Sequence, residues 1–205
     1  MKEKNIILAA RVLSMVFTPF YLSLVGLTAL FTFSYLSMMP WPYKTAVLAM
    51  VYLFTILMPT LLIHFYRHHH GWTLIELGRK ERRMVPYIIS IICYFTGYYV
   101  MHRFNIPHFM SNILMAALVI QILCALTNVW WKISTHTAAI GGVAGALTAF
   151  SAIFMFNPVS WLCIVLILAG MVGTSRMILR QHTLPQVLAG FGLGFVCAYA
   201  VVLLL

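Results

Sequence analysis

Three short polar clusters interrupt an otherwise apolar sequence, and the middle one, residues 132–137, holds groups that could transfer a proton beside an anion. Ser134 or Thr135 can cap a helix that begins there. Backbone N–H groups at the start of a helix bind anions. A histidine in such a place, here His136, can donate a proton to a leaving group.

The other two clusters are rich in cations. Residues 175–186 contain Arg176 and His182 six positions apart, and Gln186 follows His182 by four. Residues 77–86 carry four basic residues ahead of a proline that can start a helix. Taken alone, this run is more typical of a solvated basic loop than of a site. Its basic residues are Arg79, Lys80, Arg82 and Arg83, of which Lys80 and Arg83 share a face if the run is helical.

The elements that must position these clusters are membrane helices. Hydrophobic residues make up 63% of the 205 residues and charged residues only 8%, against about 25% charged residues in a soluble domain. We predict an all-α integral membrane protein: one domain over residues 1–205, a bundle of six or seven transmembrane helices after a short N-terminal interfacial helix that ends near Pro19. A spanning helix needs about 20 apolar residues, and the candidates are 20–38, 45–66, 87–102, 109–130, 137–156, 159–173 and 187–205.

Carboxylates are nearly absent from the chain. It contains no aspartate, and its only glutamates are Glu3, Glu76 and Glu81. This composition argues against glycoside hydrolysis, against a carboxylate-bound magnesium site and against a carboxylate proton relay through the membrane. His64 and His68 have a spacing that could share a metal ion, but no nearby residue completes a ligand set. We therefore expect no metal and no cofactor.

The basic residues gather on one side of the predicted bundle. With seven spans, the N-terminus and the segments 67–86, 130–136 and 174–186 share one face, which receives 11 of the 13 basic residues. Basic loops usually stay in the cytoplasm, so topology is one explanation. The other is a pocket for the phosphate of a membrane lipid, at headgroup depth. Nucleic acid is a poor partner because the basic residues lack a soluble platform.

Taken together and in this order, the clusters resemble the motifs of the PAP2 (type 2 phosphatidic acid phosphatase) superfamily of membrane lipid phosphatases. The third family motif, SR-x5-H-x3-D, is matched by Ser175, Arg176 and His182, with Gln186 in place of the aspartate. The second, PSGH, survives as the run 133–136, in which isoleucine replaces proline and threonine replaces glycine. The first, lysine-x6-arginine-proline, is matched only loosely before Pro86. The resemblance covers about residues 77–205.

The resemblance implies a phosphatase that uses a phosphohistidine intermediate and no metal. In this scheme His182 attacks phosphorus, and His136 protonates the leaving oxygen and then activates water. Gln186 could accept a hydrogen bond from His182 but supplies no negative charge. The implied substrates are lipid phosphomonoesters or pyrophosphates of the phosphatidic acid, phosphatidylglycerol phosphate or polyprenyl pyrophosphate class. The residues implied to bind phosphate are Lys80, Arg83, Arg176 and the backbone near Ser134, with Arg79 in reserve.

Several alternatives stay open. A non-catalytic relative could bind or move a phosphorylated lipid, which the Gln186 position favours, and a transporter could be built around the histidines. The resemblance suggests a site that faces away from the cytoplasm, whereas the charge distribution suggests the reverse. We expect a multi-pass protein of the cell membrane. The spacings Gly141–Gly145 and Gly190–Gly194 favour close helix packing and also permit a homodimer.

Overall fold

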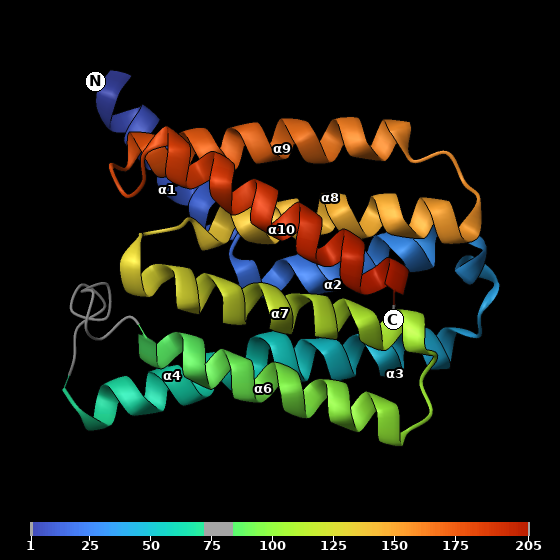
Figure 1. Ribbon diagram of the computed structural model, residues 1–205. Coiled ribbons are helices and arrows are strands. Elements are labelled where there is room, and N and C mark those ends of the chain that lie inside the picture. Colours follow the sequence, from blue (N-terminus) through green and yellow to red (C-terminus); the bar gives the residue numbers. More distant parts are fainter. Residues whose placement is uncertain (1, 72–83, 205) are drawn as a thin grey trace.

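The computed structural model describes residues 2–71 and 84–204, which form a bundle of helices without a strand among them (Figure 1). The long helices run roughly alongside one another, and α8 and α10 cross at a shallow angle in the middle of the bundle. The elements are α1 (Lys2–Val16), α2 (Pro19–Phe33), the 3-10 helix η1 (Tyr35–Met38), α3 (Trp41–Tyr52), the π-helix η2 (Leu53–Leu57), α4 (Met58–His69), α6 (Met84–Arg103), α7 (His108–Trp130), α8 (Thr135–Phe154), α9 (Val159–Ile178) and α10 (Leu184–Leu204).

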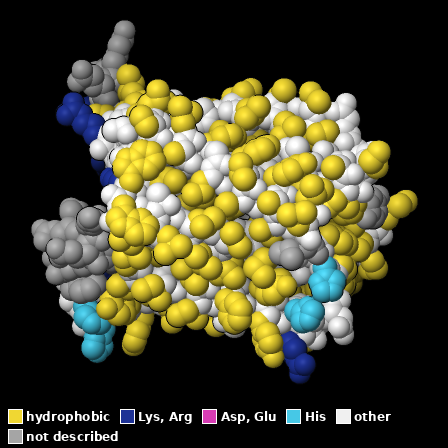
Figure 2. Space-filling view, viewed as in Figure 1, with side chains coloured by type: hydrophobic (Ala, Val, Ile, Leu, Met, Phe, Trp, Pro, Cys, Tyr) yellow, Lys and Arg dark blue, Asp and Glu magenta, His cyan; other side chains and the backbone are white. Residues whose placement is uncertain are grey.

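Six helices among the described residues are long and apolar enough to cross a membrane, with α3, η2 and α4 forming one continuous helix, Trp41–His69. The count rises to seven if the N-terminal pair, bent by 71°, forms a single span. Hydrophobic side chains cover the side of the bundle seen in Figure 2, and Lys, Arg and His side chains lie near its two ends. The prediction of an all-α membrane bundle with six or seven spans is thus confirmed.

The break between α1 and α2 lies where the sequence predicted a junction. Pro19 is the first residue of α2. Proline lacks an N–H group, and its ring clashes with the preceding turn of a helix, so it is tolerated at a helix start but not in a helix interior. The α1 helix therefore ends at Val16, and the chain turns before α2 begins.

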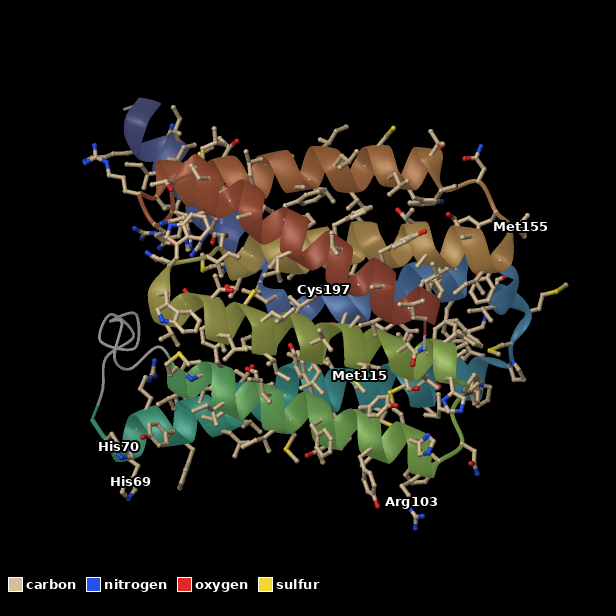
Figure 3. The ribbon with its side chains drawn as sticks, in the orientation of Figure 1. His69, His70, Arg103, Met115, Met155 and Cys197 are labelled. Carbon is tan, nitrogen blue, oxygen red and sulfur yellow. The ribbon has the colours of Figure 1, made fainter. Side chains whose placement is uncertain are left out.

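The connecting segments alternate between two ends of the bundle (Figure 1). The N-terminus, the end of α4 and the segments 131–134 and 179–183 lie at one end, which we call the cluster end. The segments 34–40, 104–107 and 155–158 lie at the other end with the C-terminus. Figure 3 shows His69 and His70 at the cluster end, and Arg103 and Met155 at the opposite end. This is the arrangement expected from the order of the spans.

The tightest packing in the bundle joins α8 to α10. A Cβ atom added to Gly141 or Gly145 of α8 would overlap the backbone oxygen of Phe191 or Phe195, respectively. A Cβ atom on Gly194 of α10 would overlap the carbonyl oxygen of Ala138. Glycine is therefore required at these positions, because any side chain would push the two backbones apart. Both G-x-x-x-G spacings are thus used within the chain, between the two helices that carry the second and third clusters.

Candidate active site

The second cluster forms the start of α8. Ser134 is completely buried, and its Oγ accepts a hydrogen bond from the Thr137 N–H at 3.4 Å. A serine in this position satisfies one of the four N–H groups that a helix start leaves without a partner. The cap places His136 in the first turn of α8.

A side-chain amide fixes the segment that leads into this cap. Asn128, in the last turn of α7, accepts a hydrogen bond from the Ile133 N–H at 3.3 Å. Its Nδ2 donates to the Tyr87 hydroxyl of α6 at 2.8 Å. One buried amide thus joins α6, α7 and the approach to α8, which agrees with the usual role of such amides between membrane helices.

The third cluster folds back on itself through a Schellman motif. The Gln181 N–H donates to the Arg176 carbonyl at 3.1 Å, and the Arg180 N–H donates to the Met177 carbonyl at 2.9 Å. Arg180 adopts the left-handed conformation, with φ of 53°, that this ending requires. The chain therefore reverses right after α9, and the His182 N–H lies 3.4 Å from the Arg176 carbonyl.

Two hydrogen bonds join the second cluster to the third. Lys132 Nζ donates to the Gln181 carbonyl at 2.5 Å. The Ser134 N–H donates to the backbone carbonyl of Gln186 at 3.3 Å. Together with the glycine packing of α8 on α10, these bonds bring residues nearly fifty positions apart to the same place.

His136, Arg176 and His182 converge at this place. His136 lies close enough to Arg176 and His182 for their charges to act on it. Its ring also hydrogen-bonds with the backbone of Ser14, and the Arg176 guanidinium donates through Nη1 to Ser14 Oγ at 2.5 Å. Figure 3 shows side-chain nitrogen atoms gathered at the cluster end, where α1 meets α8 and α9.

In this group, His136 Nδ1 and Arg176 Nε are buried without a hydrogen-bond partner among the described residues. Such atoms are rare because leaving a buried polar group unsatisfied costs about 1–3 kcal/mol. A buried ring nitrogen and a buried guanidinium nitrogen that lack partners suit an anion that can accept hydrogen bonds. The arrangement can therefore hold a phosphate group beside two histidines.

Ser14 is the site residue that the sequence did not reveal. It belongs to α1, which packs along α9, and it is 7% exposed. The sequence places it 162 positions from Arg176. A single serine in an apolar helix carries no pattern of its own, so no sequence feature could have identified it.

Gln186 has a structural role in addition to its position in the motif. Its side-chain Oε1 accepts a hydrogen bond from the Thr183 N–H at 3.1 Å. Threonine followed three residues later by glutamine is a capping box, and here it secures the start of α10. The oxygen that could orient His182 is thus already bonded to the backbone.

The remaining predicted residues stand apart from this site. Arg79, Lys80 and Arg83 lie outside the described residues. His64 and His68 are exposed on α4, and His64 Nδ1 lies 3.4 Å from Arg67 Nη2. Within residues 2–71 and 84–204, no group of three or more His, Cys, Asp and Glu side chains is placed to hold a metal ion. The exposure of His64 and His68 gives no support to a transport path built around them.

The fold and the site define a class of protein: an α-helical membrane bundle with a histidine–arginine site at one end. Residues 127–205 match the family model of the PAP2 superfamily. The match confirms the resemblance of the second and third clusters to this superfamily, and the first cluster lies outside the matched region. Ser134, His136, Arg176, His182 and Gln186 all lie in the matched region. Members of this superfamily are in general phosphatases that act on phosphorylated substrates. No curated protein and no solved structure matches the chain.

Proposed function

We propose that this protein is a metal-independent phosphatase of the cell membrane that hydrolyses a phosphomonoester or a pyrophosphate on a lipid. Candidate substrates are phosphatidic acid, phosphatidylglycerol phosphate and polyprenyl pyrophosphate. The observation that carries the proposal is the convergence of His136, Arg176 and His182, with buried nitrogen atoms of His136 and Arg176 left unpartnered. The membership of the matched region in a phosphatase superfamily supports it.

The proposed reaction has two steps. In the first, a ring nitrogen of His182 forms a bond to phosphorus while the bond from phosphorus to the leaving oxygen breaks, and His136 gives that oxygen a proton. In the second, His136 takes a proton from water, whose oxygen attacks phosphorus. The bond between phosphorus and nitrogen then breaks, which releases phosphate and restores His182.

The phosphate oxygens need positive charge and hydrogen-bond donors throughout both steps. Arg176 supplies both, because its planar guanidinium matches two phosphate oxygens at once. Backbone N–H groups in the first turn of α8, next to Ser134, add donors where negative charge develops. By analogy with the family, Lys80 and Arg83, with Arg79 in reserve, complete the phosphate shell.

Phosphate release by the full chain in lipid nanodiscs tests the proposal. We expect His182→Ala to abolish release and to prevent the formation of a protein-bound phosphate that can be trapped by a rapid alkaline quench, because a bond between phosphorus and a histidine nitrogen survives base but not acid. The matched control is His102→Ala, an exposed histidine in the last turn of α6 at the other end of the bundle. Release that persists in His182→Ala would remove the nucleophile from the scheme.

A second function is favoured by Gln186. A neutral side chain cannot stabilise a charged His182 as a carboxylate would, and its oxygen already accepts from Thr183. A non-catalytic protein that binds or moves a phosphorylated lipid would show lipid binding that depends on Arg176, without turnover. Gln186→Asp separates the two: a large gain in rate indicates a degenerate enzyme, and no gain together with retained binding indicates a binder.

A further inference from the structure

A large, partly open apolar cavity lies between the helices of the bundle, beside α8. Its volume is about 590 Å³, which falls within the range of about 300–1,000 Å³ that is usual for ligand sites. Side chains from α2, α7, α8 and α9 form most of its wall, and most of them are apolar. Half of this wall, from α2 and most of α7, lies outside the region matched by the family model.

The cavity runs along one stripe of α8. The stripe residues are Thr135, Ala139, Val143, Ala146 and Phe150, spaced three or four positions apart and therefore on one helix face. From Thr135 to Phe150 the helix rises by about 22 Å, which is most of the hydrocarbon thickness of a bilayer. The cavity is thus long and crosses much of the membrane interior.

One end of the cavity lies at the start of α8, the helix that carries His136. Thr135, which lines the cavity, is the neighbour of His136 in the first turn of α8. Pro19, also in the wall, begins α2 five residues after Ser14, whose hydroxyl accepts from Arg176. The other end lies at Phe156 and Trp161, near the opposite end of the bundle. A molecule that fills the cavity therefore has one end at the first turn of α8, which also carries His136, although neither His136 nor Arg176 lines the cavity.

The cavity exists because small residues face one another across it. Ala139 and Ala146 lie on its α8 wall, and Ala116 and Ala117 on its α7 wall. On the α2 side, a Cβ atom added to Gly26 would meet no atom within 4 Å. An apolar space of this kind does not attract water, so it favours an apolar occupant.

We propose that this cavity holds the hydrocarbon tail of the phosphorylated lipid whose phosphate lies at His136 and Arg176, and that its depth selects the length of that tail. This inference rests on the proposed function, because it takes the site at the cluster end to bind a lipid phosphate. The tail is drawn into the protein between α2, α7, α8 and α9, with the headgroup at the membrane surface. The tail, and not only the phosphate, then determines which substrates are used.

Two substitutions that shorten the cavity to different depths test the proposal. Ala139 lies about 6 Å and Ala146 about 17 Å below Thr135 along the axis of α8. We expect Ala139→Phe to exclude all but short tails, and Ala146→Phe to exclude only long ones. The measurement is the ratio of kcat/KM for a long-tailed lipid phosphate over a short-tailed one. Each substitution should lower this ratio by at least about tenfold, since several methylene groups lose their burial.

The matched control is Ala152→Phe, which adds the same bulk to the same helix at an exposed position. We expect Ala152→Phe to keep the tail-length preference of the native chain. An unchanged ratio in both Ala139→Phe and Ala146→Phe would overturn the tail-binding proposal while leaving the phosphatase proposal intact. If the native chain releases no phosphate from any substrate, the phosphatase proposal fails. A binding experiment then tests whether the cavity holds the lipid tail.

Binding is tested with the native chain and a lipid phosphate that carries a photoreactive diazirine at the end of its tail. We expect the label on residues that line the deep end of the cavity, such as Trp161. The outward-facing Ile167 of the same helix serves as the internal reference. Labelling confined to outward-facing residues of α9 would overturn the proposal whether or not the protein is catalytic, and it does not depend on the folding of any variant.

Discussion

The two sides of α8 use small residues in opposite ways. On the side that faces α10, Gly141 and Gly145 bring two backbones into contact. On the side that faces α2, α7 and α9, Ala139 and Ala146 border a cavity of about 590 Å³. The first side fixes the distance between the second and third clusters, and the second leaves room for a ligand.

This difference is decided by the partner helix and not by α8 itself. The α10 helix also has glycines at this contact, Gly190 and Gly194, so the surfaces of α8 and α10 fit closely. The helices on the other side present small residues as well, but a cavity remains between them and α8. Small residues in a membrane helix therefore indicate close contact between two helices only where the facing helix packs directly against them.

The largest effect on stability is expected from Gly194→Val, which disrupts the close packing of α8 against α10. Its new Cβ would overlap the Ala138 carbonyl oxygen, a backbone atom that cannot move without shifting α8. Overpacking of this kind costs about 3 kcal/mol or more. We expect a much lower midpoint of thermal unfolding and a loss of phosphate release for every substrate, whatever its tail.

Gly192→Ala is the matched control for that change. A Cβ atom at Gly192 meets nothing within 4 Å, although the residue lies on the same helix, two positions away. Its unfolding midpoint should stay close to that of the native chain. Equal midpoints for Gly194→Val and Gly192→Ala would contradict the close approach of α8 and α10.

A smaller effect on stability is expected from Ser14→Ala. This variant tests whether a single hydrogen bond holds α1 at the site, where no glycine packing is present. The substitution removes the oxygen that accepts from Arg176 at 2.5 Å. A hydrogen bond to a charged group contributes about 1.5–3 kcal/mol. We expect a lower unfolding midpoint, measured against Ser151→Ala, whose hydroxyl donates only to the Thr148 carbonyl of its own helix. Similar midpoints in the two variants would show that α1 is held by apolar packing alone.

The overall fold could be predicted from the sequence because its causes are local. Apolar stretches of membrane length give the spans, Pro19 gives the break before α2, and the order of the spans gives the two ends of the bundle. Ser134 was one of two residues expected to cap α8, and it is the one that does. Each of these features depends on residues that are close together in the chain.

The site could be predicted only in part, because it depends on contacts between distant segments. The motif spacing identified His136, Arg176 and His182 as partners, and the structure brings them together. Ser14 comes from a helix that no motif connects to the others, so its part in the site follows only from the packing of α1 on α9. The cavity also has no sequence pattern, since alanines that border a space look the same as alanines that pack.

The third prediction concerns the cap that places His136. Ser134→Ala removes the oxygen that accepts from the Thr137 N–H, and the loss of a helix cap typically costs about 1 kcal/mol. We expect a modest fall in the unfolding midpoint and a lower rate for short-tailed and long-tailed substrates alike. Ser160→Ala, in the first turn of α9, is the control, because the N–H group of Val159 at the start of that helix donates to Asn157 and not to Ser160. A selective loss with long tails would instead assign Ser134 to the tail cavity.

The smallest effect on stability is expected at Gln186, where two roles can be separated. Gln186→Ala removes the acceptor for the Thr183 N–H at the exposed start of α10 and should cost about 0.5–1 kcal/mol. Gln186→Glu keeps that acceptor, since glutamate also completes a capping box, and adds a negative charge near His182. Its unfolding midpoint should therefore stay near the native value. Any change in the rate of phosphate release by Gln186→Glu then results from the added charge alone. An unfolding midpoint of Gln186→Glu as low as that of Gln186→Ala would show that the bond to Thr183 does not stabilise α10.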